Sequence, residues 1–169
     1  MRRLVSVLML GALAACSHLG GSKADTEEQE YDVKARPQED VAPPPFPKAA
    51  SLVEFSADAA TGNRFLIDAD TLSLVADEMV RYVMVVRSSG GAENVSFEGI
   101  SCLTRQQRNY AFGTRGGGWS PARDSQWLPI EARSGSAPRL VLAGDFFCGS
   151  NVRPRSLREI LQLLRYGRR

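Results

Sequence analysis

Few side chains in this sequence have the chemistry of a nucleophile, a general base or a metal ligand. The 169 residues include a single histidine, His18, and three cysteines. Serine and cysteine nucleophiles are usually activated by an imidazole, and many zinc sites combine cysteine with histidine. His18 lies near the N-terminus, before the apolar segments that could form a folded core. We therefore expect no catalytic residue, no metal site and no cofactor, and we expect that the protein is not an enzyme.

The acidic residues offer two weaker possibilities. Asp68-Ala69-Asp70 has the spacing that opens a calcium loop, but Ser73 stands where that loop needs glycine and Met79 where it needs glutamate. We interpret both aspartates as turn or capping residues after a strand. Glu98 could be a buried acid, but one strand does not indicate a pair of carboxylates for acid–base chemistry. A hydrolase that uses Glu98 and Asp145 is therefore the least favoured hypothesis.

The residues before Cys16 have the order of a targeting segment. Arg2 and Arg3 precede an apolar stretch, Leu4–Leu13, of about ten residues, which is shorter than a membrane span of roughly 17–25 residues. A positive start, a short apolar core and small residues at the end are typical of a secretory signal peptide. One alternative is ordinary signal cleavage in which Cys16 has no role. Leu13-Ala14-Ala15-Cys16 also resembles a bacterial lipobox, in which the thiol is acylated and the chain is cut directly before it.

The lipobox interpretation predicts where the protein is held. Residues 1–15 would be removed as a signal peptide, and acyl chains such as palmitate on Cys16 would attach the protein to a membrane. Two or more chains give stable attachment, whereas one binds only marginally. Ser17 follows the cysteine, and in Gram-negative lipoproteins a residue other than aspartate at this place favours transfer to the outer membrane. We expect a lipoprotein in the outer membrane of a Gram-negative bacterium, facing the periplasm.

Length and charge limit what the remaining chain can be. Residues 16–169 are enough for one modest hydrophobic core. The formal net charge of +2 includes Arg2 and Arg3, so the mature chain is close to neutral. Nucleic-acid binding needs a clustered basic surface, and we therefore expect no nucleic-acid partner.

The other two cysteines, Cys102 and Cys148, are predicted to form a disulfide. Disulfides persist in an oxidising periplasm, and two cysteines allow only one intramolecular pairing. Closing a loop of this length stabilises the fold by roughly 4 kcal/mol when the entropy of the unfolded chain is considered. The alternative is two buried free thiols.

Residues 16–50 are predicted to be a lipidated N-terminus followed by a disordered tether. The stretch is polar and acidic at first and then rich in proline, with Pro43, Pro44, Pro45 and Pro47 close together. Low hydrophobicity and many prolines favour a solvated spacer. A proline-rich ligand for another protein is the less favoured alternative.

Residues 51–169 are predicted to form one globular domain of the α+β class, a mostly antiparallel β-sheet with a C-terminal amphipathic helix. Alternating or β-branched segments separated by glycine-rich turns indicate the strands. Leu157, Ile160, Leu161 and Leu164 have helical spacing, and Ser156 with Glu159 fits a capping box. The predicted strands are Val53–Phe55, Phe65–Ile67, Val80–Arg87, Val95–Gly99, Asn109–Thr114, short segments at Trp119 and Trp127, and Leu140–Leu142.

The order of these features resembles the cryptic neisserial protein-like family of proteobacterial envelope proteins. The resemblance implies a small exported domain with a pair of cysteines, and it implies no catalytic residue. The resembling stretch, from about Val53 to Cys148, includes Phe65-x-Ile67-Asp68, Thr71-Leu72-Ser73-Leu74, Val80-Arg81-Tyr82, Asn94-Val95-Ser96-Phe97-Glu98-Gly99-Ile100-x-Cys102, Tyr110-Ala111-x-Gly113, Trp119 and Phe147-Cys148.

Two functions are compatible with these observations. The favoured hypothesis is a non-enzymatic envelope assembly or interaction module, held by the acyl chains on Cys16, with an envelope protein or a glycan as its partner. The alternative is a periplasmic binder of a small or lipidic ligand, in a pocket lined by Tyr110, Trp119 and Trp127, although such aromatic residues often belong to the core. A structure can show whether these three side chains line a pocket or fill a core.

Overall fold

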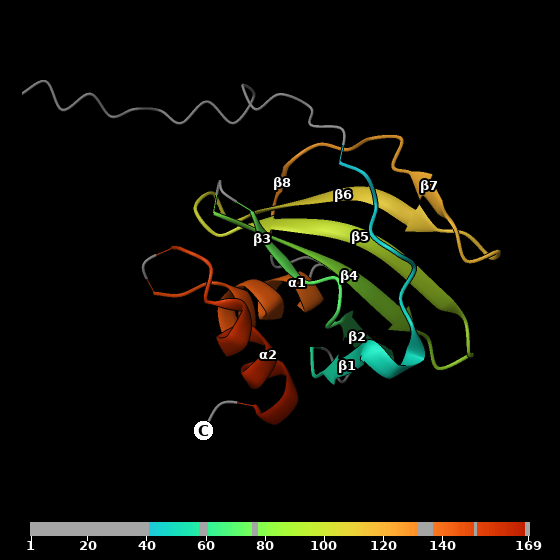
Figure 1. Cartoon of the computed structure of the whole chain (residues 1–169), viewed down its shortest axis with the longest axis horizontal. Helices are drawn as coiled ribbons and strands as arrows, with labels where there is room; N and C mark the ends of the chain where they lie inside the picture. The colour runs from blue at the N-terminus through green and yellow to red at the C-terminus, as the bar shows by residue number, and fades with distance from the viewer. Residues whose placement is uncertain (1–40, 58–60, 76–77, 132–136, 151, 168–169) are drawn as a thin grey trace, which may run out of the picture. The chain divides into compact units, whose positions relative to one another are not determined.

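A computed structural model describes residues 41–57, 61–75, 78–131, 137–150 and 152–167 (Figure 1). The chain divides into two units, Met1–Asp32 and Val33–Arg169, and all described residues belong to the second unit. The predicted signal peptide, Cys16 and residues 16–40 of the predicted tether lie outside the described residues.

The described residues form an antiparallel sheet of eight strands, as the sequence predicts. The main path through the sheet is β1-β2-β4-β5-β6-β7, with β3 beside β4 and β8 beside β6. The two longest strands, β4 and β5, pair along their whole lengths and form the centre of the sheet. The strands are β1 (Leu52–Phe55), β2 (Arg64–Asp68), β3 (Ser73–Val75), β4 (Met79–Arg87), β5 (Glu93–Ser101), β6 (Gln106–Gly113), β7 (Trp119–Pro121) and β8 (Leu128–Pro129).

The sheet carries a hydrophobic cluster on each face, because the central strands are apolar on both sides. Along β4, Tyr82 and Met84 belong to one cluster, whereas Val83 and Val85 belong to the other. Successive side chains of a strand point to opposite faces, so the continuous apolar run in β4 predicts burial on both faces. Both faces of the sheet therefore need a cover.

One face is covered by helices. The π-helical turn η3 (Leu142–Phe147) and helix α2 (Leu157–Tyr166) contribute buried side chains to the cluster that contains Tyr82, and partly buried side chains of helix α1 (Ala137–Val141) pack against it. Figure 1 shows α1 and α2 together on this side of the sheet.

The prediction of a strand at Leu140–Leu142 is wrong, because these residues belong to α1 and η3. Leu142 and Phe147, at the two ends of η3, are both fully buried. The backbone N–H of Cys148 also donates to the carbonyl of Ala143, with the five-residue offset of this helix type. Three apolar residues in a row do not distinguish a buried strand from a buried helix.

Helix α2 confirms the predicted C-terminal helix. Its N-cap, Ser156, accepts a hydrogen bond from the backbone N–H of Glu159 at 3.3 Å. Ile160 and Leu164 are buried against the sheet, and Gly167, in the left-handed region with φ 74°, ends the helix. In the described part of the chain, no helix is long and apolar enough to cross a membrane.

The other face of the sheet is covered by residues 41–48, part of the stretch predicted as a tether. Val41 and Phe46 pack against the cluster that contains Val83 and Val85. Figure 1 shows this segment, in cyan, crossing the strands. A 3-10 turn, η2 (Ala49–Ser51), then leads into β1. Among the described residues, packing on the sheet therefore includes Val41 and Phe46, whereas the sequence predicts that the domain begins at residue 51.

Candidate functional site

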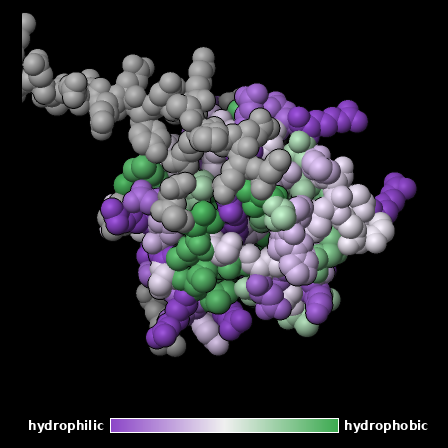
Figure 2. Space-filling view, turned by 45° about the horizontal axis from the view of Figure 1, so that its top comes forward, coloured by the Kyte–Doolittle hydropathy of each residue, from purple (hydrophilic) through white to green (hydrophobic). Residues whose placement is uncertain are grey.

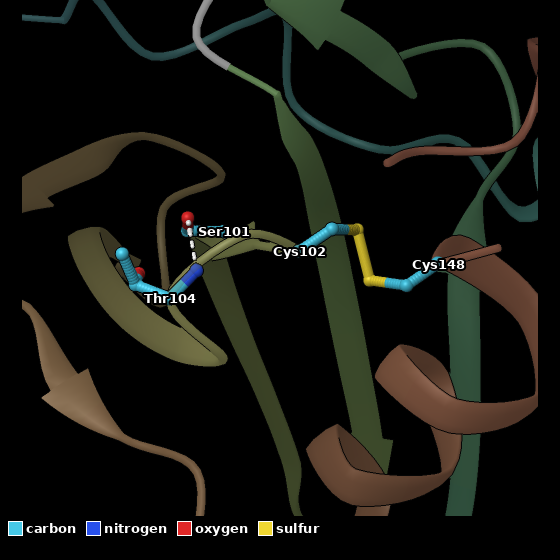
Figure 3. The surroundings of a disulfide bond; sticks show 4 residues. All are labelled: Ser101, Cys102, Thr104 and Cys148. Atoms are coloured by element: carbon cyan, nitrogen blue, oxygen red, sulfur yellow. Dashed lines mark hydrogen bonds between the residues drawn. A yellow bond between two sulfur atoms is a disulfide. The ribbon is translucent and has the colours of Figure 1, made fainter. Parts of the chain in front are cut away.

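The predicted disulfide between Cys102 and Cys148 is present. Cys102 directly follows β5, Cys148 directly follows η3, and their Cα atoms are 5.5 Å apart (Figure 3). Both cysteines are buried. In the turn after β5, the backbone N–H of Thr104 donates to the hydroxyl of Ser101 at 3.3 Å. The disulfide therefore links the end of a central strand to the helical layer that covers it.

Tyr110 and Trp127 lie together over Gly99 in the middle of the sheet. A Cβ atom added to Gly99 would lie 3.0 Å from the Tyr110 ring and hydroxyl and 3.4 Å from Trp127 Cη2. The register between β5 and β6 shifts at Phe97 and Glu98, and Tyr110 is the extra residue of this β-bulge. Glycine at position 99 thus gives the two aromatic side chains room to approach the strand.

Two arginines flank the Tyr110 ring. The guanidinium carbons of Arg81 and Arg108 lie 5.5 and 4.9 Å from the ring centroid, within the range of cation–π attraction. The Nε of Arg108 donates to the hydroxyl of Ser125, which itself donates to the carbonyl of Asn109. These contacts hold the loop before β8 against β6.

Trp119, at the start of β7, contacts the N-terminal segment. Its indole Nε1–H donates to the carbonyl of Pro44 at 2.8 Å. Its ring centroid is 5.3 Å from that of Phe46 and 6.3 Å from that of Phe97. The Phe97 ring is also 5.1 Å from Tyr110, so Phe97 connects the two predicted ligand-contact residues.

The three aromatic residues named from the sequence therefore lie on one face of the sheet, and two of them pack into its second hydrophobic cluster. Tyr110 is a buried member of that cluster and Trp119 packs against it. A cleft of about 410 Å³ lies elsewhere, and none of the three aromatic residues lines it. Its lining comes from the N-terminal segment and from the turn between β2 and β3: Pro44, Pro45, Phe46, Lys48, Ser51, Asp68, Asp70, Thr71, Leu72 and Ser73.

A buried ion pair between Glu98 and Arg139 is the feature that the sequence did not predict. Arg139 Nε donates to Glu98 Oε2 at 2.8 Å, and Arg139 Nη2 donates to Oε1 at 2.6 Å. The Tyr82 hydroxyl donates to Oε2 at 2.9 Å and the Ser96 hydroxyl to Oε1 at 2.5 Å. The Glu98 side chain is 0% exposed and that of Arg139 is 17% exposed. Each carboxylate oxygen thus accepts two hydrogen bonds.

The electrostatics of this group favour the charged guanidinium of Arg139 and the neutral phenol of Tyr82. Burial, together with the neighbouring Glu98 charge, raises the pKa of Tyr82 well above its usual value. Burial disfavours the charged form of Arg139, but the Glu98 carboxylate outweighs this effect and raises the pKa of the guanidinium above its usual value. A carboxylate held by four donors is a structural anion, and its lone pairs are occupied rather than directed at a substrate.

The sequence contains a signal for a buried charge at Glu98, but it does not identify Arg139 as the partner of this charge. Glu98 stands in a strand beside Phe97, and a charge in a buried strand requires a counter-charge. Arg139 is 41 residues away, on a helix that the sequence analysis did not predict. Among the described residues, no group of three or more histidine, cysteine, aspartate or glutamate side chains could hold a metal ion.

The fold and the disulfide define a small α+β domain in which one cysteine follows a central strand and the other follows the helical layer. The sequence model of the CNP1-like family matches residues 32–165, which is more than half of the chain. The chain therefore belongs to the CNP1-like family, and the resemblance to the cryptic neisserial protein-like family is confirmed. No curated protein and no solved structure matches the chain.

Proposed function

We propose that this protein is a non-enzymatic lipoprotein of the outer membrane whose domain faces the periplasm and acts as an envelope assembly or interaction module. The Cys102–Cys148 disulfide is the observation that carries the proposal. Disulfides of this kind persist in oxidising compartments and are rare in the cytosol. The lipobox at Cys16 supplies the matching anchor, because it belongs to chains that are exported and acylated.

The arrangement around Glu98 is that of a structural ion pair rather than of a general acid or base. A general acid or base needs a proton site that faces the substrate, with a pKa near the working pH. Glu98 is fully buried and accepts hydrogen bonds from Arg139, Tyr82 and Ser96. This group orders the core beneath α1 and leaves the surface of the domain for contacts.

The surface of the domain also supports an interaction role. Figure 2 shows hydrophobic side chains gathered near the middle of one face and bordered by hydrophilic side chains. Apolar patches with a polar rim are typical of surfaces that contact another molecule. An envelope protein or an envelope glycan is the partner class that fits an outer-membrane anchor.

Fatty-acid labelling in cells tests the anchor. We expect labelled palmitate to be incorporated into the wild-type protein and the label to be lost in Cys16→Ala. The matched control is the double variant Cys102→Ser/Cys148→Ser, which should keep the label because the disulfide cysteines are not acylated. Unchanged labelling of Cys16→Ala would show that the anchor is wrong.

Crosslinking in intact cells tests the interaction role. We expect the wild-type protein to be crosslinked to an envelope protein or to a glycan. A control lipoprotein that has the same anchor should not be recovered with that partner. If crosslinking recovers no partner under conditions that retain the known partner of a control lipoprotein, the interaction role is not supported.

Binding of a small or lipidic ligand is a second candidate function, favoured by the cleft of about 410 Å³. This volume falls within the usual range of ligand sites, and Phe46 and Leu72 provide apolar walls. Native mass spectrometry of the protein purified from its own envelope tests this candidate. A bound small molecule that is lost in Ser73→Trp, which changes a half-buried residue lining the cleft, supports it, and a mass of the protein alone counts against it.

A further inference from the structure

The segment that crosses the second face of the sheet has an unusually restricted backbone. Residues 43–47 read Pro-Pro-Pro-Phe-Pro, and their peptide bonds are trans. Each proline fixes its own φ, and a residue that precedes proline is directed to extended or polyproline II geometry. Residues 41–48 accordingly belong to neither a helix nor a strand. This segment lies on the sheet as an extended peptide rather than as an added strand.

The sheet recognises the backbone of this segment through one tryptophan. The indole N–H of Trp119 donates to the carbonyl of Pro44 at 2.8 Å. Prolines have no N–H, so their carbonyls are the backbone groups through which a polyproline segment can be bound. A donor on an aromatic side chain is the chemistry by which proline-rich peptides dock in aromatic-lined grooves.

The sheet also provides a packing site for the ring of Phe46. A Cβ atom at position 113 would lie 3.1 Å from Phe46 Cε2, so glycine at this position of β6 lets the ring approach the strand. The same Cβ would lie 2.7 Å from Val95 Cβ. The ring also packs against Trp119, with the centroids 5.3 Å apart. Phe46 therefore occupies a place that is shaped for an aromatic side chain.

We propose that this face is a recognition site for proline-rich segments that carry an aromatic residue, and that residues 43–47 of the chain fill it. We call it the proline-binding face, formed by Val95, Phe97, Gly113 and Trp119. A proline-rich segment of a second polypeptide offers the same carbonyls and ring and competes for the same place. The inference rests on the proposed interaction role, because it names the partner chemistry of that module.

Residues 43–47 are part of the same chain as the sheet, and this covalent link determines the concentration at which a free peptide can displace them. A segment joined to its site by a short linker has an effective concentration in the millimolar range. A free peptide therefore displaces it only at millimolar concentration, unless the internal contact is weakened. Phe46→Ala removes the ring and leaves all four residues of the proline-binding face in place.

The test uses the mature protein in detergent and a synthetic peptide, VAPPPFPKAA, which is residues 41–50. We expect the peptide to displace residues 43–47 and therefore to shift the backbone N–H signals of Phe46 and Lys48 in an NMR titration, with the Trp127 indole signal as internal reference. The Phe46→Ala protein should bind the peptide at least about tenfold more tightly than wild type does. Trp119→Phe, made in the Phe46→Ala protein, should weaken binding about three- to tenfold because one hydrogen bond is lost.

Two controls match these variants. Phe112→Ala removes an aromatic ring of the same kind that is 45% exposed beside Gly113, and peptide affinity should equal that of wild type. A peptide in which alanine replaces its phenylalanine should bind to neither protein. The wild-type titration itself keeps the proposal testable if Phe46→Ala does not fold.

Each possible result of the titration either supports or overturns the proposal. The proposal is overturned if several millimolar peptide leaves the Phe46 and Lys48 signals unchanged in wild type, or if both peptides shift these signals and that of Trp127 equally. A dimer that grows with protein concentration and is lost in Trp119→Phe supports it, with a second copy as the source of the segment. A negative peptide titration does not change the fatty-acid labelling result, so failure of the proposed recognition site can be distinguished from failure of the proposed anchor.

Discussion

At the scale of single residues, Glu98 shows how a charge is accommodated inside this sheet. Its carboxylate accepts two hydrogen bonds from Arg139 and one each from Tyr82 and Ser96. A buried ion pair contributes little net stability compared with apolar residues of the same shape, but removal of one partner leaves an uncompensated charge. The network therefore acts mainly by requiring that α1 lie over β5.

Arg139→Ala should destabilise the domain by about 3 kcal/mol at neutral pH, because it leaves the Glu98 carboxylate buried without its counter-charge. Urea unfolding followed by tryptophan fluorescence measures this change. The matched control is Arg64→Ala, which breaks the Arg64–Glu54 pair, with side chains 59% and 46% exposed. An exposed pair contributes less than about 1 kcal/mol, so equal losses in the two variants would contradict the account.

The raised pKa of Tyr82 predicts a loss of stability at alkaline pH. Because the pKa of Tyr82 is higher in the folded than in the unfolded protein, the stabilisation is complete below the ordinary tyrosine pKa of 10.0 and declines as the pH rises above it. Above that pH each further unit costs up to about 1.4 kcal/mol, until the folded pKa is reached.

Tyr82→Phe provides the measurement for this pH dependence. The variant should be less stable than wild type by about 2 kcal/mol at pH 8, because it lacks the hydrogen bond to Glu98. The difference should shrink when urea unfolding is repeated above pH 10. A difference that is constant from pH 8 to pH 11 would show that the phenol is not protected from ionisation.

At the scale of secondary-structure elements, the edge strands next to β6 are short and contain proline. Pro121 of β7 pairs with Ala111, and Pro129 of β8 pairs with Gln106. Proline cannot donate a backbone hydrogen bond, so an edge that contains it does not readily accept another strand. Contacts with a partner are therefore expected through the faces of the molecule rather than by addition of a strand at this edge.

The disulfide is the strongest link between the sheet and the helical layer. Cys102 and Cys148 are 46 residues apart, and opening a loop of this length should lower stability by about 4 kcal/mol. The double variant Cys102→Ser/Cys148→Ser, compared with oxidised wild type in urea unfolding, measures the loss. Reduced wild type should unfold at the same urea concentration as the variant, and oxidised and reduced protein of equal stability would contradict this prediction.

The sequence predicts the elements whose pattern is local. The β-branched run of β4 and the helical spacing of Ile160 and Leu164 each identify their element without help from the rest of the chain. β3 was not predicted, because three residues carry too short an alternation. Arg139 was not predicted as a partner of Glu98, because only the tertiary fold brings the two together.

At the scale of the whole molecule, the proline-rich composition of the N-terminal stretch gives a misleading prediction of where the domain begins. A proline-rich stretch has the same composition whether it is a solvated spacer or a peptide packed on a surface. Phe46 distinguishes the packed peptide from the solvated spacer. A lone aromatic residue among prolines can bury its ring only when a sheet with Gly113 and Trp119 is present. Residues 41–48 thus belong to the fold before β1 begins.

The intact mass of the protein purified from membranes is the most direct test of the proposed lipid-anchored, disulfide-linked domain outside the cytosol. We predict a chain that begins at Cys16, carries acyl chains on that cysteine, and gains the mass of two hydrogen atoms on reduction. A mass that retains residues 1–15, that lacks acyl chains, or that does not change on reduction would contradict the claim.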